Sequence, residues 1–225
     1  MRRVQHAIHL TNTGGRGKNH PLEIFSNMAK QTNWLAVQRT VREKGLTIFS
    51  PQDLLNLIGG SEISQRFLLT RAVKRGDALK LRRSLYALAS HPPSELEVAN
   101  RLYRPSYVSF TFALSYYHII PETVYAITCA TTRTSAAFDV LGKQFIYRRV
   151  KRAAFTGYRT EQVNNRAVLI AEPEKALVDT LYFVALNKQG LPERVDIARL
   201  SKQKISAFAK LFAHPALDRL VEELI

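Results

Sequence analysis

Three carboxylates and a lysine lie close together in one segment of the chain, at Glu172, Glu174, Lys175 and Asp179. Side chains of these types can bind a divalent metal ion and activate water, so the segment is compatible with a metal-dependent nuclease. The same residues fit the start of a helix, because Pro173 suits the first helical position and acidic side chains in a first turn interact favourably with the helix dipole. We favour the helix start and keep the nuclease as the alternative.

Other reactive side chains form no recognisable site. Ser106, Ser109 and His118 lack the spacing of a known nucleophile arrangement. The single cysteine, Cys129, cannot form an internal disulfide, and no Cys/His spacing fits a zinc ligand set. We therefore expect a protein that is not an enzyme, with no catalytic residues, no metal and no cofactor.

Positive charge is the strongest functional signal. The 225 residues include 33 Lys and Arg against 18 Asp and Glu, which gives a net charge of +15. Residues 1–90 hold 15 of these cations and only five acids, so two thirds of the excess lies there. Such a surface attracts nucleic acid, an anionic membrane or an acidic protein. No long amphipathic helix pairs the charge with exposed aromatic residues, which disfavours membrane binding.

Residues 28–90 have the pattern of a winged helix-turn-helix. Apolar spacing predicts a helix over 28–44, and Ser50-Pro51 begins a second helix that ends at Gly59-Gly60. Ser64 is the expected N-cap of a third helix that runs to Gly76, with Ile63 packed on Leu68. Two short strands, 78–82 and 85–88, then form a basic hairpin.

The third helix has an apolar side and a cationic side, which suggests how it meets DNA. Its amino-terminal part would face base edges, so Gln65, Arg66 and Thr70 are the candidate base readers. The candidate phosphate contacts are Arg71, Lys74, Lys80, Arg82 and Arg83. Ser64 could also contact a phosphate, although its capping role is favoured.

A second basic cluster lies in the other half of the chain and comprises Arg148, Arg149, Lys151 and Arg152. It could extend a DNA footprint or contact RNA, and it fits a solvated loop equally well. The sequence leaves these alternatives open.

The rest of the chain predicts a mixed α/β domain over 95–225, after a hinge at His91-Pro92-Pro93. Helices are expected at 95–103, 109–118 and from Pro173, and strands at 123–130, 144–150 and 166–171. The tail, 195–225, is expected to be helical with breaks near Ser201 and His214-Pro215. Residues 1–27 are glycine-containing and basic, and we expect a flexible arm. The predicted fold class is thus α+β.

Three stretches, in this order, resemble the AbiEi-type antitoxins of bacterial abortive-infection (type IV toxin–antitoxin) systems and related transcriptional regulators. The first combines FSPQDLL at 49–55 with LRRSLYAL at 81–88, where the family usually has glycine at the position of Ser84. The others are YVSFTFAL at 107–114, followed by residues 120–129, and LIAEPEKALVD at 169–179. The resemblance covers roughly residues 30–190.

The resemblance implies a function. The first domain would bind inverted repeats in its own promoter, with oligomers forming on the DNA, and would repress the operon. The second would support antitoxicity. A cognate nucleotidyltransferase-like toxin would be encoded nearby and neutralised without a stable complex.

We expect a cytoplasmic protein. A basic adaptor that binds an acidic protein is a further alternative.

Overall fold

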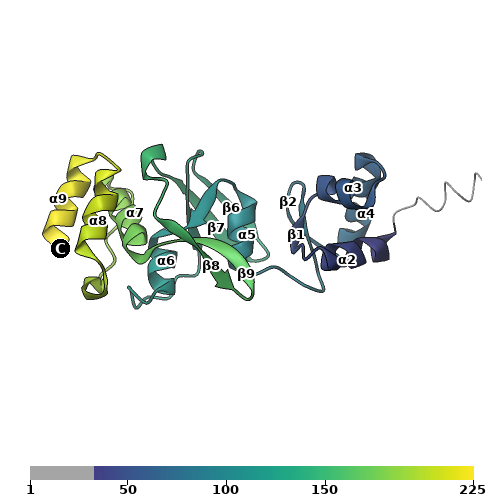
Figure 1. Cartoon of the computed structure of the whole chain (residues 1–225), viewed down its shortest axis with the longest axis horizontal. Helices are drawn as coiled ribbons and strands as arrows, with labels where there is room; N and C mark the ends of the chain where they lie inside the picture. The colour runs from purple at the N-terminus through teal and green to yellow at the C-terminus, as the bar shows by residue number, and fades with distance from the viewer. Residues whose placement is uncertain (1–32) are drawn as a thin grey trace, which may run out of the picture.

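The computed structural model describes residues 33–225 and has a mixed α+β fold with eight α-helices. Figure 1 shows an elongated arrangement, with three helices and a small sheet at one end, a larger sheet in the middle and the last helices at the other end. The arm expected at 1–27, and the first residues of the helix expected at 28–44, lie outside the described residues. Among the described residues, no helix is long and apolar enough to span a membrane.

The first part of the chain alternates helices with a three-stranded antiparallel sheet. Its elements are α2 (Trp34–Glu43), β1 (Ile48–Phe49), α3 (Pro51–Ile58), α4 (Glu62–Lys74), β2 (Ala78–Arg82) and β3 (Leu85–Leu88). The strand order is β1-β3-β2. Ser50 and Asp53 form a capping box at the start of α3, which confirms the expected helix start with Pro51 in the first turn.

Backbone geometry explains two tight turns. Gly76 follows α4 with a φ of +79°, and its N–H and that of Asp77 donate to the carbonyls of Val73 and Ala72. This Schellman pattern ends the helix where the sequence predicted. Ser84 adopts a φ of +61° between β2 and β3. This is the left-handed region that favours glycine, so the serine occupies a conformation better suited to glycine.

The second part of the chain is built on a six-stranded mixed sheet. Its strands are β4 (Ser106–Val108), β5 (Ile127–Thr131), β6 (Ala136–Val140), β7 (Lys143–Arg149), β8 (Tyr158–Val163) and β9 (Arg166–Ala171). The order is β6-β7-β5-β4-β9-β8, with parallel pairing between β5 and β7 and between β4 and β9. The helices are α5 (Glu95–Leu102), α6 (Phe110–Tyr116), α7 (Pro173–Ala185), α8 (Lys202–Lys210) and α9 (Pro215–Leu224), with short 3-10 turns at Arg152–Ala154 and Ile197–Arg199.

The sequence predicted the helices better than the strands. All expected helices of this part are present, and the tail breaks where Ser201 and His214 act as N-caps. The strand expected at 123–130 begins only at Ile127. Strands β4, β6 and β8 were not anticipated. β4 is only three residues long, and β6 and β8 carry partly exposed side chains that weaken the apolar signal.

The two sheets share part of one apolar core. A small cluster that includes Val37, Leu54 and Leu69 holds the first three helices together. Ile48 and Ala87 of the small sheet instead belong to the large core of the second part. Hydrogen bonds reinforce this junction, since Thr47 Oγ1 donates to Glu97 Oε1 at 2.9 Å and an Arg166 guanidinium donates to the Gly45 carbonyl at 2.8 Å. The small sheet is thus fixed directly against the large one.

Candidate nucleic-acid interface

Helix α4 begins earlier than the sequence suggested. Ser61 is the N-cap, and its Oγ accepts a hydrogen bond from the Ser64 N–H at 3.1 Å. The expectation that Ser64 caps the helix was therefore wrong, because Ser61 supplies the same hydroxyl one turn earlier. Ile63 lies within the first turn with 67% of its surface exposed, so the expected packing of Ile63 on Leu68 as an N-terminal staple was also wrong.

One face of α4 points to solvent along its whole length. Its exposed residues follow helical spacing and are Ile63, Arg66, Phe67, Thr70 and Lys74, with Arg71 beside them. Arg66 forms an exposed ion pair with Glu62 one turn earlier, at 2.7 Å, and the Thr70 hydroxyl donates to the Arg66 carbonyl. Such an exposed pair contributes little to stability, so Arg66 can exchange Glu62 for another anion at low cost.

Gln65 lies on the opposite, inward face of α4. Its residue surface is completely buried, and Nε2 donates to the Gly59 carbonyl at 2.7 Å. At 100° per residue, Gln65 shares its side of the helix with Leu69 and Ala72, both buried. This geometry corrects its assignment as a base reader: the side chain secures the turn between α3 and α4 and does not reach the surface.

The three cations of the β2–β3 hairpin differ in their surroundings. Lys80 and Arg83 are exposed. Arg82 turns toward the second part of the chain: its Nη1 donates to the Leu102 carbonyl at 2.8 Å, and its guanidinium carbon lies 4.4 Å from the centre of the Phe138 ring. An irregularity in the pairing of β2 falls between Lys80 and Arg82. Arg82 is half-buried and joins the two sheets through part of its guanidinium group.

The second basic cluster is also divided. Arg148 is half-buried between the rings of Phe110 and Phe183, and it donates to Gln189 Oε1. This burial lowers the pKa of its guanidinium. The Lys151 ammonium donates to the Phe212 and Ala213 carbonyls just beyond the carboxyl end of α8. Both cations therefore have structural partners.

Arg149 and Arg152 remain exposed and share one hollow of about 570 Å³ with Lys151. Thr132, Val150 and Tyr182 complete its lining. Three members of the second cluster are thus accessible to solvent.

Two members of the acidic segment at the start of α7 are buried as a pair. Lys175 and Asp179 have no exposed side-chain surface and pair with each other. The second Asp179 oxygen accepts hydrogen bonds from Ser109 Oγ at 2.7 Å and from the Tyr107 hydroxyl at 3.1 Å. Desolvation lowers the pKa of Lys175 and raises that of Tyr107 well above its usual value. This network ties α7 to β4 inside the core.

The remaining carboxylates of this segment are engaged elsewhere. Glu172 pairs with Lys204 at 2.6 Å, and Glu174 accepts a hydrogen bond from the backbone N–H of Ser201 at 3.2 Å. Over residues 33–225, no group of three or more His, Cys, Asp or Glu side chains is placed to hold a metal ion. Cys129 is fully buried, and burial raises the pKa of its thiol. The geometry gives the nuclease alternative no support.

No family model and no curated protein sequence matches the chain. Among solved structures, the Rv2827c protein of Mycobacterium tuberculosis is similar at 14% identity and a TM-score of 0.44. The match covers 82% of this chain and 78% of that one. The likeness is distant, and the name of that protein states no activity.

Sequence patterns missed two features of the interface. Ile63 was expected to precede the helix and Phe67 was not singled out as a contact, yet 67% of Ile63 and 61% of Phe67 are exposed on α4. Helical spacing counted from Ser61 would have placed both on the outer face. Nothing local could have revealed that Arg82 contacts Leu102 and Phe138, because that contact joins distant segments.

Proposed function

We propose that residues 28–90 form a winged helix-turn-helix and that the protein binds double-stranded DNA through it. The order of three helices followed by a hairpin, with α4 reached through the short turn at Gly59-Gly60, supports this topology. The observation that carries the proposal is the outward face of α4, where Arg66 and Thr70 stand free of the core with Arg71 and Lys74 beside them. In this geometry α4 enters the major groove.

Each exposed side chain has a role within that arrangement. Arg66 can bind a guanine edge with two parallel hydrogen bonds, and Thr70 can bond to either kind of base. Phe67 and Ile63 offer apolar contact to thymine methyl groups. Arg71, Lys74, Lys80 and Arg83 contact phosphates, which orient the protein without reading sequence. Ser64, exposed in the first turn, can donate its hydroxyl to a phosphate when it is not bonded to Ser61 Oγ.

Arg149 and Arg152 of the second cluster extend this footprint as additional phosphate contacts. They belong to the α/β domain proposed for residues 95–225, which the Arg82 contact joins to the hairpin. A footprint longer than the half-site of α4 would support their participation.

The biological role follows from the resemblance to AbiEi-type antitoxins. We propose that this protein is a cytoplasmic, non-enzymatic repressor that binds inverted repeats upstream of its own operon, with two or more copies on one operator. A nucleotidyltransferase-like toxin encoded alongside would be counteracted without a stable complex. Expression of the neighbouring reading frame alone should arrest growth, and co-expression of this protein should restore it.

Binding to the DNA upstream of its own gene tests the first half of the proposal. Electrophoretic mobility shift with that fragment, in the presence of excess unrelated duplex, should give a discrete complex, which the Arg66→Ala variant should form only at a higher protein concentration. Binding of both fragments with equal affinity would contradict sequence recognition. Capture of an acidic protein that survives nuclease treatment, with no DNA retained, would favour the adaptor alternative.

A further inference from the structure

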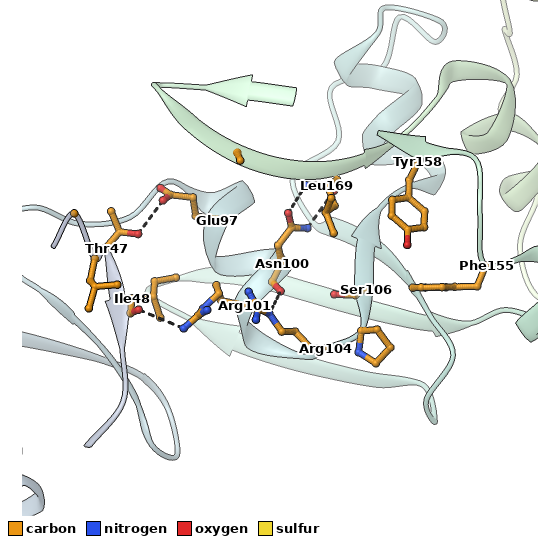
Figure 2. A pocket seen from close by; sticks show the side chains of 14 residues that line it. Thr47, Ile48, Glu97, Asn100, Arg101, Arg104, Ser106, Phe155, Tyr158 and Leu169 are labelled. Atoms are coloured by element: carbon orange, nitrogen blue, oxygen red, sulfur yellow. Dashed lines mark hydrogen bonds between the residues drawn. The ribbon is translucent and has the colours of Figure 1, made fainter. Parts of the chain in front are cut away.

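A cavity of about 380 Å³ opens where the first part of the chain meets the second. Figure 2 shows its walls, which come from the segment before β1, from α5 and β4, and from the strands β8 and β9. Gly45, Leu46, Thr47 and Ile48 line one side, and residues of the larger sheet and its helix line the other. The volume falls within the range typical of small-molecule sites.

A buried hydroxyl without a partner lies in this wall. Ser106 is only 4% exposed, and within the described part of the chain its Oγ has no hydrogen-bond partner. Leaving a buried hydroxyl unsatisfied is unfavourable, and native proteins rarely tolerate it without a reason. A ligand in the cavity could supply the missing hydrogen bond.

Two arginines give the same cavity a positive character. Arg101 lies in the last turn of α5, Arg104 lies two residues beyond the end of that helix, and both line the cavity. Each makes a long hydrogen bond to a backbone carbonyl, Arg101 to Ile48 at 3.4 Å and Arg104 to Asn100 at 3.3 Å (Figure 2). A guanidinium has five N–H donors, so most of their donors remain open.

The nearby carboxylate does not neutralise these arginines. Glu97 accepts hydrogen bonds from Thr47 and from the Ser94 N–H, and it lies 3.8 Å from Arg166. Burial and the charge of Arg101 both lower the pKa of Arg104, as expected for neighbouring cations without a counterion. Among residues 33–225, neither arginine forms an ion pair with an acid.

The far wall is aromatic. The rings of Phe155 and Tyr158 have centroids 5.5 Å apart, and Tyr158 stacks on the buried ring of Tyr107 at 4.6 Å. Both Phe155 and Tyr158 border the cavity near Ser106 (Figure 2). Rings held in this way present a firm apolar surface to a planar molecule.

We propose that this cavity is a binding site for a small anion that carries a planar ring. The anionic group would bind Arg101 and Arg104, the ring would pack against Phe155 and Tyr158, and the Ser106 hydroxyl would donate or accept a hydrogen bond. Arginine suits a carboxylate or a phosphate, because its planar donors match either group. The site is independent of the outward face of α4.

Isothermal titration calorimetry with matched probes tests the site on the full-length protein. Benzoate represents an aromatic carboxylate and AMP a nucleoside monophosphate, and their neutral counterparts are benzamide and adenosine. At least one anionic probe should bind at one molecule per chain, about tenfold or more tighter than its counterpart. The probe that binds identifies the source of the anion. Failure of both anions to bind, or equal binding of anion and neutral counterpart, would overturn the proposal.

Two variants locate the binding. Arg104→Gln removes one cation from the mouth of the cavity and should lower the affinity for the anionic probe about tenfold. Ser106→Ala removes the unpartnered hydroxyl, which should weaken binding and leave the urea midpoint of the free protein unchanged or higher. Arg219→Gln removes a positive charge from the exposed side of α9 and serves as the matched control.

The interpretation of the variants does not depend on whether the protein binds DNA. Unchanged affinity in Arg104→Gln, or equal weakening in Arg219→Gln, would show that the probe binds elsewhere and would overturn the proposal. All of these titrations are carried out without DNA, so they stand whether or not the protein proves to be a repressor.

Discussion

The side-chain amide of Gln65 donates a hydrogen bond to the main-chain carbonyl of Gly59, at 2.7 Å, across the turn that joins α3 to α4. The bond reaches back six residues from a fully buried position. It fastens the buried side of α4 to the turn before it, opposite the face that carries Arg66 and Thr70. A residue that looks polar and accessible in the sequence is thus buried and stabilises the turn.

Replacing Gln65 with Ala should destabilise the protein without altering base preference. Loss of the amide removes the partner of the Gly59 carbonyl at a partly buried turn, which costs about 1–3 kcal/mol. Urea unfolding followed by circular dichroism measures this loss. Selection from a randomised duplex library, under conditions where the variant is folded, should return the wild-type motif. A changed base at one position would restore Gln65 to the set of base readers.

Replacing Arg66 with Ala should weaken binding to the operator selectively. A bidentate contact with guanine contributes about 1–3 kcal/mol of discrimination, which corresponds to a loss of roughly 5- to 150-fold for the operator and little change for unrelated DNA. Fluorescence anisotropy with both duplexes measures the difference. Lys74→Ala is the matched control on the same helix, and it should weaken both duplexes equally. Equal losses in the Arg66 variant would assign that arginine to phosphate.

The two exposed cations of the hairpin should govern the salt dependence of binding. Each phosphate neutralised adds about 0.9 to the slope of log affinity against log salt, so replacing both Lys80 and Arg83 with Ala should reduce the slope by about 1.8. Arg82→Ala should leave the slope unchanged and lower the urea midpoint, because its guanidinium contacts Leu102 and Phe138. A lower slope in the Arg82 variant would return that residue to the DNA contacts.

Ser84→Gly should stabilise the hairpin. Its φ of +61° lies where a side chain is disfavoured by about 1–2 kcal/mol, and glycine's greater freedom in the unfolded chain offsets part of that gain. We expect a net increase of about 0.5–1 kcal/mol in the free energy of unfolding. DNA affinity should not change. A destabilised variant would show that the serine hydroxyl has a role that its backbone conformation does not explain.

Lys175→Met should be strongly destabilising. It leaves the Asp179 carboxylate buried without its cation, a change that typically costs about 3–5 kcal/mol. Lys204→Met, which breaks the exposed pair with Glu172, is the control and should barely move the urea midpoint. A Lys175 variant that is as stable as the control would indicate that the pair is open to water, and would reopen the question of chemistry at this position.

Local sequence patterns correctly predicted several helix ends, because these depend on a few neighbouring residues. Ser50-Pro51 and Gly76 mark helix ends through backbone geometry that depends on a few neighbouring residues, and the structure confirms both. Long-range contacts were beyond such signals. Strand β4 forms only because β5 and β9 flank it, and Arg82 is drawn from the hairpin surface by partners 20 and 56 residues away in the sequence.

The same distinction between local patterns and long-range contacts holds for the candidate site. Helical periodicity correctly separated Arg66, Thr70, Arg71 and Lys74 from the core, because exposure on a helix follows from spacing alone. Gln65 was misassigned because polarity was taken as exposure, and only the turn carbonyl of Gly59 explains its burial. No sequence pattern predicted the cavity at the junction, because Ser106, Arg101 and Tyr158 meet there only in the folded chain.

Selection from a randomised duplex library is the most direct test of the central claim, that α4 reads the DNA sequence while the hairpin contacts its phosphates. The wild-type protein should enrich a motif of inverted half-sites, and a related sequence should lie upstream of its own gene. Arg66→Ala should lose preference at one position of each half-site while the others are retained. Enrichment of no motif by the wild-type protein, or of an identical motif by the Arg66 variant, would contradict the account.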